Sequence, residues 1–522
     1  MSRNPKHGLG GFRQGPVFLF ARGDGFRFFG RLIRPGENGV TLELTRTSEQ
    51  PLREMRMLPD AVPREESRAM ARQLMEPYWE AAVKQKNQLA QNRALQSLAG
   101  ADPMGVLQKL DAPEFAHARV KSVIQRRVAE MLAWTDPTEA ETVAEAIDEP
   151  GARAAALVAV ADVLPDQKRD QKLAVLDRAA IQARAAADLQ DRLHRLGVVA
   201  ERYFELRKVE TAKTLFAEGV RLASQLTDKT DSRRGRFAAC LARVDLPAAL
   251  AIASEFPASG RDSKSSVLSN IVTHIAADQP AEAERILRQL VPQGRGLSWL
   301  SPPIVWKMAK VDPARARKLV DESQTQLDRP QLNLFLALGL KSRDPAAAHE
   351  AFQTAMRGID RLMKEGPEYS AMQGRRWVVF PLVEQIDPAL VPELFWRALA
   401  TRLPTGNPRA VHDVSPAALV GLLGWYDREV AAALFEPIRE RIEHTDDVEL
   451  ARWWIEFEGW STIDPRAAVT RLEQVPVTAA LENTADLARS GVALLLGMTR
   501  EQRVRQVWRG TWMGDLIDRD EF

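Results

Sequence analysis

The sequence predicts a mainly α protein, an α-solenoid of stacked helical hairpins with a small N-terminal antiparallel β region. Asp-Pro and its one-residue insertions recur at steps of 32–34 residues in much of the chain, a spacing typical of helical hairpin repeats. Apolar residues follow helical periodicity from about residue 65 nearly to the end, whereas residues 17–47 are rich in aromatic and β-branched residues. The 522 residues therefore predict about ten repeats of 32–43 residues.

Three short strands are predicted at the front of the chain. Residues 17–20 are apolar and run into the turn signal Gly23-Asp24-Gly25. Residues 26–33 are aromatic and β-branched, and residues 40–45 alternate with period two after the turn 35–39. Three strands alone have exposed edges and little core, so we expect them to pack on helices or to belong to a β-sandwich.

Each Asp-Pro is predicted to begin a helix. An N-cap Asp accepts a hydrogen bond from an unpaired backbone N–H, and Pro at the first helical position loses no hydrogen bond. The dipeptide begins at Asp102, Asp136, Asp312, Asp344, Asp387 and Asp464, with insertions in Asp245-Leu246-Pro247 and Asp278-Gln279-Pro280.

The same face of these helices is predicted to be buried each time. Three residues past the prolines lie Val106, Ala140, Leu250, Ala283, Ala316, Ala348, Val391 and Ala468. Seven past lie Leu110, Ala144, Ser254, Leu287, Val320, Phe352, Phe395 and Leu472, all apolar except the serine. A small residue followed four positions later by a larger one fits close helix packing.

The helix before each Asp-Pro has its own apolar stripe, so the repeat is a helix, a short turn and a second helix. One example pairs the stripe Val267, Leu268, Ile271, Val272 and Ile275 with the stripe Ala283, Ile286, Leu287 and Leu290. Degenerate copies are expected near residues 208–210 and 427–429. The 43-residue step from Pro345 to Pro388 implies longer helices or a loop near residues 364–367.

The predicted domain organisation has four parts. Residues 1–60 form the β region and residues 61–95 a linking helix. Residues 96–500 form the repeat array, because a single hairpin cannot bury its stripe alone. Residues 501–522 form a polar C-terminal cap and tail.

Composition excludes several protein classes. Lys+Arg is 72 and Asp+Glu is 70, a balance that argues against a protein coating nucleic acid. The apolar run 17–21 is shorter than a signal-peptide core, and no stretch is long enough to span a membrane. The chain is therefore expected to be soluble and cytoplasmic by default, although it could be part of a larger protein.

The repeat step and the Asp-Pro helix starts resemble those of tetratricopeptide-like and HEAT-like α-solenoids found in large bacterial multidomain proteins. The Trp-Leu-Gly-Tyr signature of tetratricopeptide repeats is missing. Residues 30–32, 40–45 and 50–59 resemble the end of a carboxypeptidase-regulatory-like, transthyretin-like β-domain, of which too few strands are present. The resemblance implies scaffolding or protein binding.

The sequence predicts no catalytic, cofactor or metal site. It holds no phosphate-binding loop, no nucleophile elbow and no paired histidines. Cys240 is the single cysteine, which excludes an internal disulfide and a site built on cysteines. We expect Cys240 to be a buried small hydrophobe and His274 a partly exposed surface residue. His194 and His274 lie far from Cys240 in sequence, which argues against a base for a thiol nucleophile.

Tryptophan is the unusual feature, with ten of twelve residues from Trp299 onward. In the segment 452–460, Trp453, Trp454 and Phe457 fit a core stripe with Glu456 and Glu458 facing water. A peptide-binding groove and a sugar cleft with paired carboxylates are the alternatives. The candidate partner-binding residues are Trp377, Trp396, Trp425, Trp453, Trp454 and Trp460.

These observations favour a non-catalytic scaffold that binds a protein or peptide along an extended concave surface. It is expected to bind neither nucleic acid nor the membrane interior. The alternative is an α/α-toroid, an enzyme or binder acting on polysaccharide through a Trp- and Glu-lined groove. A purely structural module of a larger protein is a third possibility.

Overall fold

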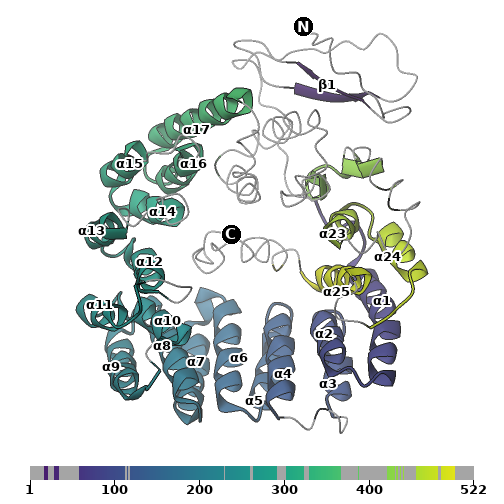
Figure 1. The fold of residues 1–522 in the computed structure, drawn as a ribbon, viewed down its shortest axis with the longest axis horizontal. Coiled ribbons are helices and arrows are strands. Elements are labelled where there is room, and N and C mark those ends of the chain that lie inside the picture. Colours follow the sequence, from purple (N-terminus) through teal and green to yellow (C-terminus); the bar gives the residue numbers. More distant parts are fainter. Residues whose placement is uncertain are drawn as a thin grey trace. The chain divides into compact units, whose positions relative to one another are not determined.

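The computed structural model describes residues 17–21, 29–33, 58–111, 115, 118–228, 230–258, 263–290, 301–322, 329–365, 454–479 and 484–499, together with residues 386, 420–421, 423–429, 431–432, 435–436, 439, 442 and 502. This part is mainly helical, as predicted (Figure 1). The chain divides into two compact units, residues 1–101 with 359–500 (unit 1) and residues 102–358 with 501–522 (unit 2). Over the described ranges, no helix combines the length and apolar character needed to cross a membrane.

Two strands are described in unit 1. Strand β1 (Val17–Ala21) pairs antiparallel with β2 (Phe29–Ile33), so that Val17 lies opposite Ile33. The third predicted strand, residues 40–45, lies outside the described residues. The three-stranded region therefore stays a prediction.

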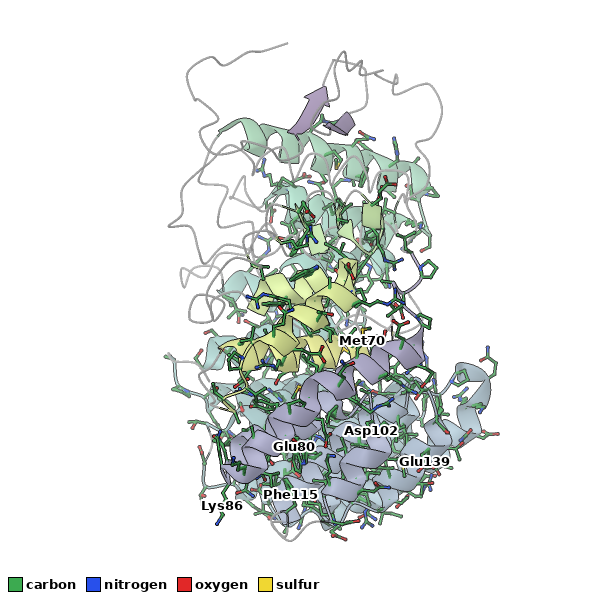
Figure 2. All side chains as sticks on the ribbon, turned by 90° about the vertical axis from the view of Figure 1, so that its right-hand side faces the viewer. Met70, Glu80, Lys86, Asp102, Phe115 and Glu139 are labelled. Carbon is green, nitrogen blue, oxygen red and sulfur yellow. The ribbon has the colours of Figure 1, made fainter. Side chains whose placement is uncertain are left out.

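The helices of unit 1 join distant parts of the chain. They are α1 (Arg64–Lys84), α2 (Gln88–Leu98), α23 (Trp454–Ile463), α24 (Pro465–Gln474) and α25 (Thr484–Gly497). Helix α1 packs against α2, α24 and α25, and Figure 2 shows it in purple beside the yellow C-terminal helices. Asn87 Nδ2 donates to the Ala479 carbonyl at 3.0 Å, and Glu66 pairs with Arg466.

Residues 61–95 contain two helices where the sequence predicts one. The chain turns between α1 and α2 at Lys86, whose φ is 54°. The next residue, Asn87, caps α2 because its side chain accepts a hydrogen bond from the Ala90 N–H at 3.2 Å. Asn is a strong N-cap residue. Asn87 therefore indicated a helix start in the sequence, although the apolar pattern runs on through this position.

A buried ion pair holds the turn between α24 and α25. The side chains of Asp486 and Arg489 are 0% and 1% exposed, with Arg489 Nη1 2.5 Å from Asp486 Oδ1. Arg489 Nη2 also donates to the carbonyls of Leu472 and Val475, where α24 ends. One guanidinium thus donates to two carbonyls at the end of a helix, where backbone carbonyls lack their regular intrahelical donors.

Unit 2 is an ordered series of helices. Their bounds are α3 (Pro103–Lys109), α4 (Ala118–Leu132), α5 (Pro137–Glu145), α6 (Pro150–Val163), the 3₁₀ turn η2 (Asp166–Lys168), α7 (Arg169–Ala185), α8 (Leu189–Glu205), α9 (Val209–Gln225), α10 (Ser232–Leu241), α11 (Leu246–Ser254), α12 (Lys264–Ile275), α13 (Pro280–Leu290), α14 (Ser301–Val311), α15 (Pro313–Asp321), α16 (Arg329–Leu340) and α17 (Pro345–Glu365).

The even-numbered and the odd-numbered helices of unit 2 form two separate rows. From α4 to α16, each even-numbered helix contacts the next even-numbered helix, and we call these seven the first row. The odd-numbered helices α5 to α15, the second row, pack mainly on first-row helices. Figure 1 shows α11, α13 and α15 on one side of α10, α12, α14 and α16. A Cβ on Gly339 of α16 would lie 2.6 Å from the Trp306 carbonyl oxygen of α14, so glycine permits their close approach.

The predicted Asp caps are confirmed at the described positions that keep Asp next to the helix start. The side chains of Asp102, Asp136, Asp245, Asp312, Asp344 and Asp464 each accept a hydrogen bond from the N–H three residues on. Asp278 differs, because α13 begins at Pro280 and the Asp278 carboxylate pairs with Arg243 at 2.8 Å. Asp387 lies outside the described residues.

The predicted buried face is confirmed, except that the buried positions of one helix lie one residue earlier than predicted. Among the described positions three and seven past proline, all but Leu250 and Ser254 are buried. In that repeat Asp245 caps the helix with Leu246 inserted before Pro247. Counting from the cap instead of the proline gives Ala249 and Ala253, and both are fully buried.

Two further expectations about helix positions agree with the described helices, while the repeat boundaries themselves stay a prediction. Helix α9 begins at Val209, within the degenerate copy expected at residues 208–210. Helix α17 runs for 21 residues to Glu365, so a longer helix accounts for part of the 43-residue step.

Candidate functional site

Three side chains that can bind a proton or a metal meet at neighbouring first-row helices. Glu201, Cys240 and His274 lie near the carboxyl ends of α8, α10 and α12, which pack side by side (Figure 1). We call them the Glu201 cluster. Cys240 and His274 are far apart in sequence, and the packing of α10 against α12 brings them together.

Glu201 is the centre of the cluster. Cys240 Sγ donates to Glu201 Oε2 at 3.6 Å, and His274 Nδ1 lies 2.8 Å from Glu201 Oε1. One ligand atom from each residue lies within 4.8 Å of the other two. The side chain of Glu201 is 10% exposed and that of His274 23%, while Cys240 is buried.

Arginines and further carboxylates surround this centre. Arg202 Nε donates to Asp162 Oδ1 of α6 at 2.8 Å, and Arg243 Nε donates to Asp278 Oδ2 at 2.8 Å. Both guanidinium groups also reach Glu205, at 3.2 and 3.4 Å. Their distances to the Glu201 carboxylate are longer, 3.5 and 3.9 Å.

The charges set the protonation of the cluster. Burial alone would raise the pKa of Glu201, but His274, Arg202 and Arg243 together outweigh it and hold that pKa well below its usual range. Burial raises the pKa of Glu205. Burial, aided by the Glu201 carboxylate, raises the pKa of Cys240 well above its usual value.

The raised pKa leaves Cys240 a neutral thiol near neutral pH. A thiol nucleophile acts as the thiolate, so the cluster as it stands does not favour nucleophilic catalysis. The buried Cys240 and partly exposed His274 were predicted and are confirmed. The expectation that sequence distance keeps His274 away from Cys240 is wrong, because α10 packs against α12 and brings the ligand atoms of the two residues within 4.8 Å.

The tryptophans proposed as a partner surface are placed only in part. Trp377, Trp396 and Trp453 lie outside the described residues, as does the side chain of Trp454, whose backbone begins α23. Trp425 is half-buried in a turn, where its carbonyl accepts a hydrogen bond from the Leu58 N–H at 2.6 Å. Trp460 is 2% exposed.

Trp460 belongs to an aromatic core in unit 1. Its ring lies 5.8 Å from the Phe457 ring, stacked at 28°, and 6.1 Å from the Phe435 ring. A side chain covered in this way offers no surface to a partner. Within this structure, Trp460 therefore follows the core interpretation of the segment.

Glu458 does not face water as expected. Its side chain is partly buried, and burial raises its pKa to about 7. Helix α25 lies close, because a Cβ on Gly491 would meet Glu458 Oε1 at 2.6 Å. The side chain of Glu456 lies outside the described residues.

Replacing Glu458 by glutamine is expected to change how stability depends on pH. The pKa of this carboxyl is about 7 in the fold and about 4.5 without it. Between these values the unfolded chain has released the proton that the folded chain keeps, so the free energy of unfolding falls as pH rises. The full loss is about 3 kcal/mol above pH ~7.

Urea denaturation from pH 4 to 8 checks this prediction. Glu458→Gln should gain stability relative to the native chain as pH rises, whereas a matched change at exposed Glu473 of α24 should not. Parallel curves for the native chain and Glu458→Gln would contradict the buried placement of this carboxyl.

No protein-family model matches the chain, and no curated protein or solved structure matches it either.

Proposed function

We propose that the chain is a non-catalytic α-solenoid scaffold, similar to tetratricopeptide-like and HEAT-like arrays, that binds a protein or peptide. The observation that carries the proposal is the continuous first row of unit 2, in which each helix from α4 to α16 contacts the next. Repeats that contact only their neighbours build extended surfaces instead of a single pocket. Such a surface suits an extended partner.

The first row is the proposed concave face. Its helices contact one another directly, whereas second-row helices pack mainly on the first row. Closer spacing along one row than along the other curves a stack toward the closer row. A concave first row would contact a partner through several repeats at once.

The charge of one part of this face, from α10 to α16, favours an acidic partner, whereas α4, α6 and α8 carry charges of both signs. Helices α10, α12, α14 and α16 carry three, one, two and one Lys or Arg, and their sequences contain no Asp or Glu. The pKa of His194 on neighbouring α8 is lowered to about 3, mainly by burial. The positive charges of Arg195, Arg236 and Arg233 lower this pKa further. We therefore propose an acidic protein segment as the partner.

One arginine of this group is structural. Arg234 is 1% exposed and pairs with Glu255 at 3.0 Å. Arg236 and Lys264, by contrast, are exposed on α10 and α12. These two residues are the points at which the proposed surface can be changed without disturbing the core.

Charge reversal tests the proposal. The intact chain, a first-row variant (Arg236→Glu, Lys264→Glu) and a second-row variant (Arg285→Glu, Lys318→Glu) serve as baits in native lysate, after circular dichroism shows all three folded. All four positions are exposed. We expect a near-stoichiometric protein that the first-row variant loses by at least about tenfold, as for removed electrostatic contacts. Equal capture by all three baits would contradict the proposed face.

The alternative function is a glycoside-active α/α-toroid. The raised pKa of Glu458 favours it, because a glycosidase needs a carboxylic acid that stays protonated near neutral pH. A second carboxylate must flank the bond, and the cause of the shift at Glu458 is burial instead of a neighbouring acid. Hydrolysis of an oligosaccharide that is abolished in Glu458→Gln would establish this alternative.

A further inference from the structure

We propose that Glu201, Cys240 and His274 form a binding site for a divalent transition-metal ion, with zinc(II) as the ion best suited to it. The site is independent of the proposed scaffold function. Zinc binds cysteine sulfur, histidine nitrogen and carboxylate oxygen, and the cluster supplies one donor of each kind. Magnesium and calcium prefer sites made of oxygen donors alone.

The separations fit one ion among the three donors. At bond lengths of about 2.0–2.3 Å, tetrahedral ligands lie roughly 3.3–3.5 Å apart. Cys240 Sγ and Glu201 Oε2 are 3.6 Å apart, and the three ligand atoms lie within 4.8 Å of one another. His274 and Glu201, at 2.8 Å, need only separate slightly by side-chain rotation. The packed ends of α8, α10 and α12 hold the backbone in place.

The charge around the cluster also suits a cation. Four carboxylates, those of Asp162, Glu201, Glu205 and Asp278, meet two guanidinium groups, those of Arg202 and Arg243. The arginines make their shortest contacts to Asp162 and Asp278. Glu201 Oε1 lies nearer to His274, at 2.8 Å, than to Arg243, at 3.9 Å, and Oε2 lies at similar distances from Cys240 and Arg202, 3.6 and 3.5 Å.

Binding follows a balanced exchange of proton for metal. The ion takes the place of the Cys240 thiol proton, which leaves to bulk water. The ionised Glu201 carboxylate can only accept from His274 Nδ1, so the Nδ1 proton moves to Nε2 through solvent, and the neutral imidazole then binds the ion through Nδ1. Arg202 and Arg243 hold the outer carboxylates away from the centre. Three protein donors leave a fourth position for water, on the side where His274 is partly exposed.

Cobalt(II) substitution tests the site in the intact chain. Cys240 is the single cysteine, so a thiolate-to-cobalt charge-transfer band in the near ultraviolet can come from no other residue. We expect this band at one cobalt per chain and its displacement by zinc. Cys240→Ser should abolish the band, and His274→Gln should weaken zinc binding by more than the roughly 10–100-fold lost on changing an outer-shell partner.

His349→Gln is the matched control and should bind zinc like the native chain, because His349 lies on α17, outside the cluster. If the cluster variants fail to fold, the native chain still gives an answer. Zinc at stoichiometric concentration should slow the reaction of Cys240 with a thiol reagent at least tenfold. The absence of both the band and this protection, or zinc binding unchanged in folded His274→Gln, would overturn the proposal.

Discussion

Replacing Arg489 by methionine is expected to lower the free energy of unfolding of unit 1 by about 3–5 kcal/mol. The side chain is 1% exposed and pairs with Asp486, which is fully buried. Removing the guanidinium takes the ion-pair partner from that carboxylate and one hydrogen-bond donor each from the Leu472 and Val475 carbonyls. An uncompensated buried charge is among the most costly defects in a fold.

Arg466→Met is the matched control, because it breaks an ion pair at an exposed position of the same unit. The side chain of Arg466 is 65% exposed where it meets Glu66, and exposed pairs contribute about 0–1 kcal/mol. Urea denaturation followed by circular dichroism measures both variants. Equal losses in the two would contradict the structural role assigned to Arg489.

Trp460→Ala is expected to lower the free energy of unfolding by about 3–5 kcal/mol, as for other buried aromatic side chains cut to alanine. The indole is 2% exposed and contacts the rings of Phe457 and Phe435. The loss combines the transfer of apolar surface with the cavity left behind. Trp425→Ala, at a half-buried turn position, should cost about 1 kcal/mol.

The same pair of variants separates a core residue from a partner-binding one. If Trp460→Ala keeps the stability of the native chain, the core placement of this residue is wrong. A larger loss in the free energy of unfolding for Trp460→Ala than for Trp425→Ala would assign the Trp460 indole to the core of unit 1.

Features set by neighbouring residues were predictable from the sequence. Asp at the N-cap and Pro at the first turn act locally, so Asp136 and Asp464 fix their helix starts without help from distant residues. The buried stripe of α12 follows from helical periodicity, and all five of its predicted residues are buried. The buried positions predicted for α11 were wrong by one residue. They were counted from Pro247, but the helix begins after the Asp245 cap, and Leu246 stands between the two.

Contacts between distant segments were not predictable in this way. The pairing of Glu66 with Arg466 joins residues 400 positions apart, and no local pattern points to it. Arg489 looks like any basic residue on a helix, since its buried role depends on where α24 ends.

The proximity of Cys240 and His274 in the Glu201 cluster could have been predicted from the sequence, although the two residues are far apart along the chain. Cys240 and His274 both lie near the end of the first helix of a predicted repeat, one predicted step apart. A repeat step places such positions next to each other in space. Aligning polar residues by their place in the repeat would have found the pair.

Photocross-linking from one hairpin tests the central claim, that the first row is the partner-binding face, most directly. A photoreactive amino acid replaces Asn270 of first-row α12 in one variant and Gln289 of second-row α13 in another, and both positions are exposed. We predict a single partner adduct from position 270 and none from position 289. Adducts from position 289 alone, or equal adducts from both, would contradict the claim.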